Sequence, residues 1–212
     1  MICGVDEAGK GAVLGPMVVG GVGCEEMGDL PTGVKDSKAL TPKRRATLYD
    51  EITGSFPWTV IEVSAADIDR FREEMSMNTI VARAHAGVIA ALAPQTAYVD
   101  ACDVNEERYA ATVTALGSPC PVIARHHADA LFPVVSAASI VAKVSRDRRI
   151  IELQEAFGAI GSGYPSDPAT IAYLREQIRA DGVPPAFARK SWKTVEEMMR
   201  DRRQRSLGDF FA

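Results

Sequence analysis

The sequence is poor in cysteine and histidine, with four of the first and three of the second among 212 residues. The cysteines are Cys3, Cys24, Cys102 and Cys120, and they show neither CxxC spacing nor a nearby histidine ladder, so no zinc site is expected. Three of them lie in apolar stretches, which predicts buried free thiols in a reducing compartment. Because 47% of the residues are hydrophobic, the chain can fill a core, which excludes a disordered, collagenous or disulfide-stapled protein.

Long hydrophobic runs, internal repeats and low-complexity segments are also missing from the sequence. The uncharged run 11–24 is too short and too rich in glycine to span a bilayer. Asp6 and Glu7 interrupt the first apolar segment, which therefore does not form a signal peptide. We expect a cytoplasmic protein that does not contact membranes.

Neither sign of charge dominates, because 24 Lys and Arg stand against 28 Asp and Glu, a formal net charge of −4. An acidic balance argues against a nucleic-acid partner, since neutralising phosphates requires clustered cations. The charge is unevenly distributed, however. Residues 175–205 hold nine Lys or Arg against five Asp or Glu, which leaves −8 on the rest of the chain. The sequence therefore predicts a basic C-terminal face beside an acidic pocket.

Strands alternate with helices along the chain, which predicts an α/β fold whose functional groups lie where strands end. The length fits one domain with a small appendage. Strands are predicted over 1–5, 12–22, 58–63, 96–99 and 121–124. Helices are predicted over 42–51, 66–74, 78–92, 106–116, 133–157, 169–180 and 193–203. The predicted division is a core over 1–157, a helical appendage over 158–203 and a tail over 204–212.

Three chain segments carry carboxylates at or after a strand. Asp6 and Glu7 end the first strand, Asp100 ends the strand predicted over 96–99, and Asp129 lies between the strand at 121–124 and the long helix. Each residue alone is explained as well by a turn, a helix cap or plain solvation. Three segments that bring acidic oxygens to one sheet edge favour a site for Mg²⁺ or Mn²⁺, which prefer oxygen ligands. Two such ions can activate a water and stabilise the leaving oxygen of a phosphodiester.

Adjacent residues of a strand point to opposite faces, so Asp6 and Glu7 reach one site only if the chain twists or bulges at 7–9. The run from Gly4 to Gly11 is also a near miss to a phosphate-binding loop. Its last position lacks the Ser or Thr that would hold Mg²⁺, and its two carboxylates would repel phosphates. An NTPase is therefore disfavoured.

His126 and His127 precede Asp129 and raise the question of a transition-metal site. Two adjacent histidines do not share one face of a strand, and oxygen ligands explain the acidic residues without them. This alternative is weak.

Seven stretches together resemble type 2 ribonuclease H, the ribonuclease HII family, and occur in the family's order. They are VDEAGKG with Gly15-Pro16, KDSK with Leu40-Thr41, YVD at 98–100, HHAD at 126–129, FPVVSAASIVAKV at 132–144, SGYPSDP at 162–168 and RKSWKT at 189–194. The resemblance implies an RNase H-like fold, with a central mixed sheet flanked by helices and a small C-terminal helical appendage. It also implies metal-dependent cleavage of the RNA strand in RNA–DNA hybrids and at single ribonucleotides in duplex DNA, leaving 5′-phosphate and 3′-hydroxyl ends. We expect the chain to act as a monomer.

The resemblance places the family's four acidic residues on Asp6, Glu7, Asp100 and Asp129. These four would be both catalytic and the ligands of two Mg²⁺ or Mn²⁺ ions, the same set that the strand ends indicate. The family's tyrosine falls on Tyr164, which would stack on the sugar beside the ribonucleotide. The alternative for this tyrosine is a loop aromatic that closes an edge of the core.

The family's glycine-basic-glycine element falls on Gly9, Lys10 and Gly11. Backbone groups there can approach the 2′-hydroxyl that distinguishes RNA from DNA, because glycine has no side chain to block them. Lys10 and Ala12 replace the family's usual arginine and proline. Lysine lacks the planar fork of arginine, so the change bears on fine selectivity more than on catalysis.

Two further groups are candidate substrate contacts. Lys35, Ser37 and Lys38 are predicted to hold the nucleic-acid backbone from a loop, the alternative being a plain surface loop. In the long helix, the spacing i, i+3, i+7 predicts a polar stripe beside Asp129. Its lysine would contact a phosphate or a carboxylate of the site, the alternative being an ordinary lysine in solvent. The stripe consists of Ser136, Ser139 and Lys143.

The tail resembles the peptide that binds sliding clamps of the PCNA type, found in archaea and eukaryotes. One helical turn would gather Leu207, Phe210 and Phe211 into an apolar plug and leave Gln204 for a polar pocket. The alternative is that the two aromatics fold back on the core. The sequence thus predicts a ribonuclease HII tethered to a clamp. A clamp-associated binder without catalysis is the other reading, against which the four carboxylates argue.

Overall fold

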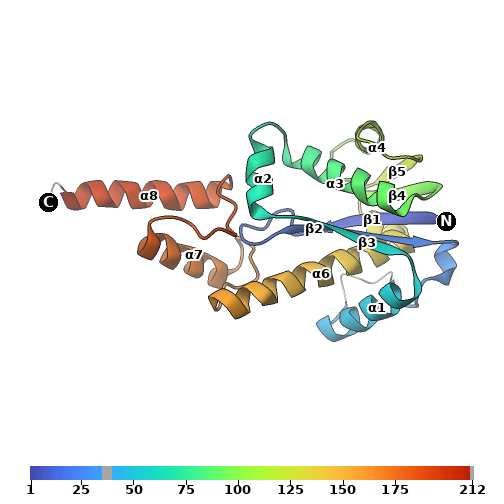
Figure 1. The fold of residues 1–212 in the computed structure, drawn as a ribbon, viewed down its shortest axis with the longest axis horizontal. Helices are drawn as coiled ribbons and strands as arrows, with labels where there is room; N and C mark the ends of the chain where they lie inside the picture. Colours follow the sequence, from blue (N-terminus) through green and yellow to red (C-terminus); the bar gives the residue numbers. More distant parts are fainter. Residues whose placement is uncertain (35–39, 211–212) are drawn as a thin grey trace. The chain divides into compact units, whose positions relative to one another are not determined.

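The computed structural model describes residues 1–34 and 40–210, and side chains up to residue 204 (Figure 1). Lys35, Ser37, Lys38 and Phe211 therefore lie outside the described residues. The chain packs into two compact units, which differ from the predicted linear division. Unit 1 comprises Met1–Lys10, Val18–Glu62 and Met75–Asp147, and unit 2 comprises Gly11–Met17, Val63–Glu74 and Arg148–Ala212.

The predicted alternation of strands and helices is confirmed. The strands are β1 Ile2–Ala8, β2 Met17–Cys24, β3 Trp58–Val63, β4 Thr96–Asp100 and β5 Val122–Arg125. The helices are α1 Pro42–Ser55, α2 Ala65–Arg72, α3 Met77–Leu92, α4 Glu106–Ala115, α5 Ala128–Leu131, α6 Pro133–Phe157, α7 Pro168–Asp181 and α8 Lys193–Phe210, with a 3-10 turn at Met27–Asp29. The sequence did not predict this turn or the short helix α5.

The sheet is mixed, with the strand order β3-β2-β1-β4-β5. Strand β1 runs antiparallel to β2 and parallel to β4, and β4 runs parallel to β5. The carboxyl ends of β1, β4 and β5 therefore lie at the same edge of the sheet. This is the predicted mixed sheet, and it fixes where the strand-end carboxylates emerge.

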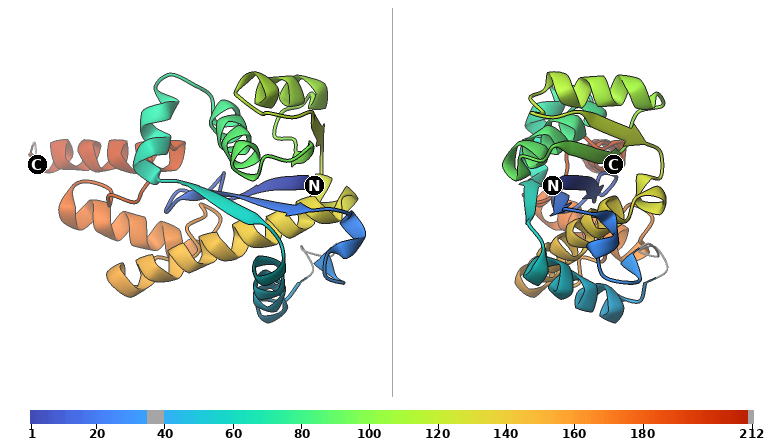
Figure 2. Two further views of the ribbon diagram at one scale, coloured as in Figure 1. Left: turned by 45° about the vertical axis from the view of Figure 1, so that its right-hand side comes forward. Right: turned by 90° about the vertical axis from the view of Figure 1, so that its right-hand side faces the viewer.

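The two faces of the sheet are covered by different helices, α3 and α4 on one side and α1 and α6 on the other (Figure 2). A Cβ on Gly4 of β1 would meet the backbone of Val134 in α6 at 2.2 Å. A Cβ on Gly21, which pairs with Val5, would meet Val88 of α3 at 2.2 Å. Because side chains alternate along a strand, even-numbered residues of β1 face α6 and odd-numbered ones face α3.

Helix α6 packs on the sheet through small side chains. Pro133 starts the helix, where its missing N–H costs nothing, and Gly158 with φ +85° ends it. Its first half is buried from all sides in a core shared with β2 and α1, which includes Val22, Leu48, Ile52, Val134, Ala137, Ala138 and Val141. Glycines on the strands and alanines on the helix let the two backbones approach closely, which places α6 against the carboxyl end of β1.

Unit 2 has a core of its own, formed by Val13, Leu14, Ile150, Ile160, Leu174, Ala188 and Val195. Val13 and Leu14 belong to this core instead of extending β2, so the predicted strand over 12–22 begins only at Met17. Helix α8 continues past the predicted end at Arg203 to Phe210. No helix in the described part of the chain is long and apolar enough to cross a bilayer.

Candidate active site

Asp6 is the most buried of the strand-end carboxylates on the sheet. It lies on the α6 side of β1 with 8% of its surface exposed. Its Oδ1 accepts the backbone N–H of Glu7 at 2.8 Å, and the side chain of Ser139 on α6 also hydrogen-bonds to it. Burial first, and then the charges of Glu7 and Asp100, raise the pKa of Asp6 well above its ordinary value. Three acidic groups therefore act on one another at this edge.

Glu7 points to the opposite side of β1, toward α3. Its side chain is 11% exposed, and its Oε2 lies 3.2 Å from Nε2 of His85. The pairing of β1 with β2 is regular as far as Ala8 opposite Val18, so β1 has no bulge up to Ala8, and the alternative of a twist at 7–9 stays a prediction. Asp6 and Glu7 keep the ordinary alternation of a strand and meet electrostatically only because both stand at its end.

Asp100 ends β4 directly beside this position, since Val5 of β1 pairs with Val99 of β4. Its Oδ1 accepts the N–H of Ala128, the first residue of α5, at 2.7 Å. Asp100, at the end of β4, therefore caps the N-terminus of α5, as the alternative interpretation of this residue predicted. Asp129 follows in the first turn of α5 and is 4% exposed. Strand β4 thus anchors the short helix that carries the fourth carboxylate.

The donor set at this edge consists of carboxylate oxygens, the ligands that Mg²⁺ and Mn²⁺ prefer. In the described part of the chain, no three His, Cys, Asp or Glu side chains are already gathered in a metal-binding arrangement. This applies also to the surroundings of His126 and His127. The residues nevertheless fit a divalent cation on one observation. Burial first, and then the charges of Glu7 and Asp100, raise the pKa of Asp6, and a cation beside the three carboxylates would offset the repulsion among them.

The glycine-basic-glycine element forms a turn directly after β1. Gly9 has φ +84°, a conformation that favours glycine, and a Cβ on Gly11 would meet nothing within 4 Å. Gly11 is exposed, so its backbone is open to a ligand. Lys10 is half-buried and hydrogen-bonds to the thiol of Cys102. Of the four cysteines, all free, Cys102 alone is not fully buried, and the other three confirm the predicted buried thiols.

The predicted polar stripe of α6 divides among three different partners. Ser136 is fully buried and donates its hydroxyl to the carbonyl of Val34, so the predicted substrate contact is wrong for this residue. Ser139 contacts Asp6. Lys143 Nζ pairs with Asp147 one turn further along the helix, at 2.5 Å, and not with a site carboxylate.

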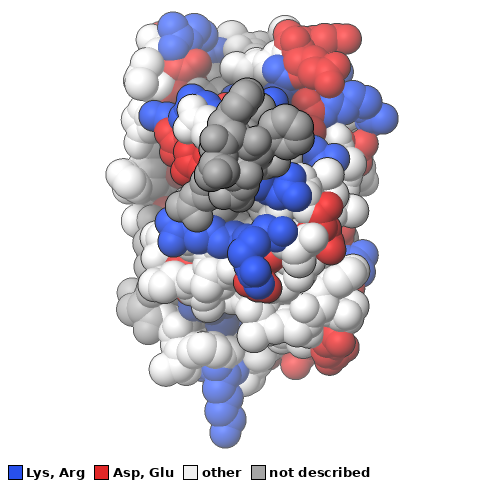
Figure 3. Space-filling model, turned by 90° about the vertical axis from the view of Figure 1, so that its left-hand side faces the viewer, with Lys and Arg blue, Asp and Glu red and all other residues white. Residues whose placement is uncertain are grey.

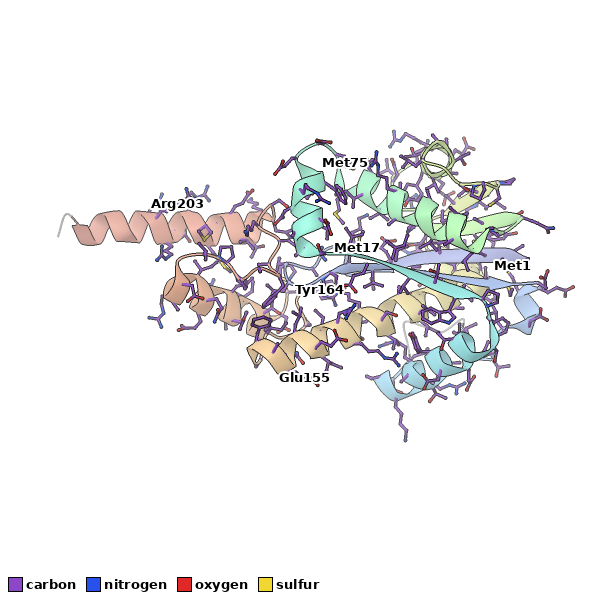
Figure 4. The ribbon with its side chains drawn as sticks, in the orientation of Figure 1. Met1, Met17, Met75, Glu155, Tyr164 and Arg203 are labelled. Carbon is purple, nitrogen blue, oxygen red and sulfur yellow. The ribbon has the colours of Figure 1, made fainter. Side chains whose placement is uncertain are left out.

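Tyr164 lies half-buried on the loop before α7 in unit 2 (Figure 4). Asp167 ties this loop together, because its carboxylate accepts the N–H groups of Ser162 at 2.6 Å and Ala169 at 2.9 Å. The carbonyl of Gly163 accepts the N–H groups of Val13 at 2.8 Å and Leu14 at 3.0 Å. The tyrosine is therefore fastened to the segment that follows Gly11 in the chain.

The RKSWKT stretch is part of the same hydrogen-bonded structure. Arg189 is fully buried, donates to the carbonyl of Gly15 from Nε at 3.2 Å and Nη2 at 3.1 Å, and stacks over Trp192. Asp69 of α2 accepts the N–H groups of Lys190 at 2.8 Å and Ser191 at 3.0 Å. This arginine is thus structural and does not add to a phosphate-binding surface.

In the C-terminal part of unit 2, exposed basic residues lie on α7, α8 and the loop between them. Figure 3 views the face at which α8 ends, where Lys and Arg side chains lie beside Asp and Glu side chains. The exposed cations among the described residues of 175–204 are Arg175, Arg179, Lys190, Lys193, Arg200, Arg202 and Arg203. Arg179 and Lys193 pair with Glu176 and Glu197. Their partners reduce the positive charge that the sequence predicts for this face.

Three of the candidate clamp-binding residues, Gln204, Leu207 and Phe210, belong to α8. Gln204 is exposed, and Leu207 and Phe210 lie in the last two turns of the helix. The single turn expected from the sequence is therefore the end of a helix that begins at Lys193.

Sequence reasoning missed two residues of this site, His85 and Tyr109. His85 contacts Glu7, and Tyr109 OH lies 3.1 Å from Nδ1 of His85. The available signal was a single imidazole in the apolar run of α3, where every neighbour on the sheet-facing side is aliphatic.

Comparisons with known proteins agree with this geometry. The family model for ribonuclease HII matches residues 3–195. A ribonuclease HII of Methanoregula boonei is 58% identical over 214 residues, covering 100% of both chains. The PCNA:RNase HII complex from Archaeoglobus fulgidus matches with a TM-score of 0.87 at 43% identity, over 93% of this chain and 96% of that one. The ribonuclease H2 of Pyrococcus horikoshii matches with a TM-score of 0.86 at 39% identity, over 95% and 98%. The chain therefore belongs to the ribonuclease HII family and is a ribonuclease H, which cleaves the RNA strand of RNA–DNA hybrids.

Proposed function

We propose that Asp6, Glu7, Asp100 and Asp129 hold two divalent cations, Mg²⁺ or Mn²⁺, and are the catalytic residues of this enzyme. The observation that carries the proposal is that Asp6, Glu7 and Asp100 stand together at the carboxyl ends of the paired strands β1 and β4, where burial first and then the charges of Glu7 and Asp100 raise the pKa of Asp6. When bound, such ions activate a water and stabilise the leaving oxygen of a phosphodiester. Cleavage of the P–O3′ bond then leaves a 3′-hydroxyl and a 5′-phosphate.

The protein's own groups hold the carboxylates in place for this chemistry. The N–H of Glu7 and the hydroxyl of Ser139 orient the Asp6 carboxylate, so that its charge stays on the α6 side of β1. Asp100 uses one oxygen to fix the N-terminus of α5 and with it Asp129. Burial of Asp6 and Asp129 limits competition from water, which strengthens electrostatic interactions with a cation.

We propose that the substrates include single ribonucleotides embedded in duplex DNA. The 2′-hydroxyl is the group that separates a ribonucleotide from its DNA neighbours. The open backbone at Gly11, with Gly9 and Lys10 before it, supports recognition of this group by main-chain atoms. Tyr164 is proposed to stack on the neighbouring sugar, and its tightly bonded loop supports a positioning role. Lys35, Ser37 and Lys38 remain candidates for backbone phosphates.

The test is cleavage of two labelled duplexes, one with a single ribonucleotide and one with a long hybrid, each with Mg²⁺ or Mn²⁺. We expect cutting of both duplexes, and loss of cutting in Asp100→Asn and Asp129→Asn. Glu155→Gln, an exposed carboxylate of α6, is the matched control and should cut as the unmodified enzyme does. Undiminished cutting by the two site variants would refute the residue assignment. Cutting of the hybrid alone would refute the proposed embedded-ribonucleotide substrate.

We propose further that the end of α8 binds a sliding clamp of the PCNA type through Gln204, Leu207, Phe210 and Phe211. The Archaeoglobus relative that matches this chain was solved as a complex with PCNA, which supports the proposal. Deletion of 204–212 should abolish binding to the clamp in calorimetry and leave cleavage of a short duplex intact. Unchanged affinity after the deletion would show that the clamp binds elsewhere. We also propose that the enzyme is a cytoplasmic monomer, which size-exclusion chromatography with light scattering tests for the oligomeric state.

A further inference from the structure

A buried chain of polar side chains leads from α4 through α3 to Glu7. His85 of α3 is 0% exposed and Tyr109 of α4 is 2% exposed. The imidazole lies between them, with Nε2 at 3.2 Å from Glu7 Oε2 and Nδ1 at 3.1 Å from Tyr109 OH. The two rings also meet edge to face, with centroids 5.8 Å apart. Both hydrogen bonds and the ring contact fix the imidazole in one orientation.

The partners of His85 restrain both nitrogens of its ring. A carboxylate oxygen accepts hydrogen bonds, so an N–H at Nε2 is the group that the ring can donate to Glu7. The hydroxyl of Tyr109 lies at Nδ1 and also hydrogen-bonds to the thiol of Cys102. Each polar group of this buried set therefore has a partner, as buried polar groups require. The tyrosine thus holds the ring in the orientation that presents Nε2 to Glu7.

We propose that Tyr109 and His85 are positioning residues, which hold the Glu7 carboxylate in the orientation in which it binds a divalent cation. The inference rests on the proposed metal site. Glu7 stands on the α3 side of β1, away from the Ser139 hydroxyl that holds Asp6, and therefore depends on a different support. A hydrogen bond from a fixed imidazole supplies that support, in the way that groups behind metal ligands orient the ligands themselves.

Two substitutions of the histidine separate this role from simple filling of space. The amide of glutamine in His85→Gln reaches the position of Nε2 and can still donate to Glu7. The shorter amide in His85→Asn reaches the position of Nδ1 and can bond only to Tyr109. Tyr109→Phe removes one hydroxyl and keeps the ring. Tyr49→Phe, a buried tyrosine of α1 in the core of unit 1, is the matched control.

The experiment is calorimetric titration of the full-length protein with MnCl₂, together with kcat and KM on a duplex that carries one ribonucleotide. His85→Asn should weaken Mn²⁺ binding by about 10–100-fold, the usual effect of removing a group behind a metal ligand. Tyr109→Phe should weaken it by about two- to tenfold, as expected for one lost neutral hydrogen bond. His85→Gln should bind closer to the unmodified protein than His85→Asn does. In each case kcat should fall with KM for the duplex unchanged, and Tyr49→Phe should change neither.

Three results would overturn the inference while leaving the metal site standing. They are equal Mn²⁺ affinities of His85→Gln and His85→Asn, an unchanged affinity in Tyr109→Phe, and a further loss when His85→Asn is added to Glu7→Gln. The last result would mean that His85 acts independently of Glu7. If His85→Asn does not fold, Tyr109→Phe decides alone, because it changes one oxygen. Failure of the unmodified protein to bind Mn²⁺ would instead refute the proposed metal site itself.

Discussion

The close approach of β1 to α6 predicts that Gly4→Ala is strongly destabilising. A Cβ at this position would lie 2.2 Å from the carbonyl oxygen of Val134, 2.3 Å from its carbonyl carbon and 2.4 Å from the nitrogen of Val135. All three atoms belong to the helix backbone, so no side chain can rotate away. Ordinary contacts begin at 3.4 Å, and the shortfall is therefore about 1.2 Å.

The magnitude follows from what the helix must give up. Moving α6 outward by about 1 Å forfeits a quarter to a half of the dispersion energy of each contact along the seam. Overpacking of this kind costs about 1–3 kcal/mol where side chains adjust, and here the backbone must move, so we expect about 3 kcal/mol or more. For a chain of this size that corresponds to a fall in Tm of about 6–12 °C. Cleavage should fall as well, because α6 carries Ser139 to Asp6.

Thermal and urea unfolding of a graded series tests this reasoning. Gly20→Ala should cost less than Gly4→Ala, because its nearest atoms on α6 are 2.7 Å and 2.8 Å from the added Cβ. Gly54→Ala, in the exposed last turn of α1 with nothing within 4 Å, should stabilise the protein by up to about 1 kcal/mol. A loss below about 1 kcal/mol for Gly4→Ala, or an inverted order of the first two variants, would refute the close approach as described.

Three further predictions concern buried and paired polar groups. Asp6→Asn should abolish cleavage but stabilise the metal-free protein. Because the pKa of Asp6 is raised in the folded state, this gain in stability should be absent below about pH 3.8 and grow as the pH rises. Urea unfolding in EDTA measures it, and a gain independent of pH would contradict the prediction. Asp167→Asn should behave oppositely, since the pKa of Asp167 is lowered, mainly by hydrogen bonds from Ser162. The variant should be less stable than the unmodified protein above about pH 3.8, and the difference should disappear as the pH falls through the lowered pKa of Asp167. Thr170→Val should lower the free energy of unfolding by about 2–4 kcal/mol, because it leaves the N–H of Gly163 and the carbonyl of Ile160 without their partner. Thr47→Val, on the exposed face of α1, is the control and should change it by less than about 0.5 kcal/mol.

The sequence predicts the strands and helices well where a local pattern decides them. The parallel strands β1, β4 and β5 are short apolar runs that end in acidic or turn residues, and the N-caps Thr41 and Ser76 start α1 and α3 by local hydrogen bonds. The gathering of Asp6, Glu7 and Asp100 at one edge follows from parallel pairing, which the alternation of strands and helices already implies.

What the sequence could not predict depends on contacts between distant residues. Residues 12–16 are an uncharged stretch directly before β2, but Val13 and Leu14 pack in the core of unit 2 and their N–H groups bond to the carbonyl of Gly163. His85 and Glu7 are 78 residues apart, and nothing local to either indicates the other. The polar stripe of α6 fails for Ser136 because the chain at Val34 covers that part of the helix. Spacing defines a face of a helix, and only the tertiary fold defines what lies on it.

The hydrogen bonds from Val13 and Leu14 to Gly163 bear on the order in which the enzyme is made. The acceptor leaves the ribosome 150 residues after Val13, which at about 5–20 residues per second is a delay of about 8–30 s. During that time Val13 and Leu14 lack this acceptor and most of the core of unit 2, although β1 before them can already pair with β2. Assembly of unit 2 must therefore wait for nearly complete synthesis, and a nascent chain stalled before residue 163 would hold the carboxylates of β1 and β4 without the loop that carries Tyr164.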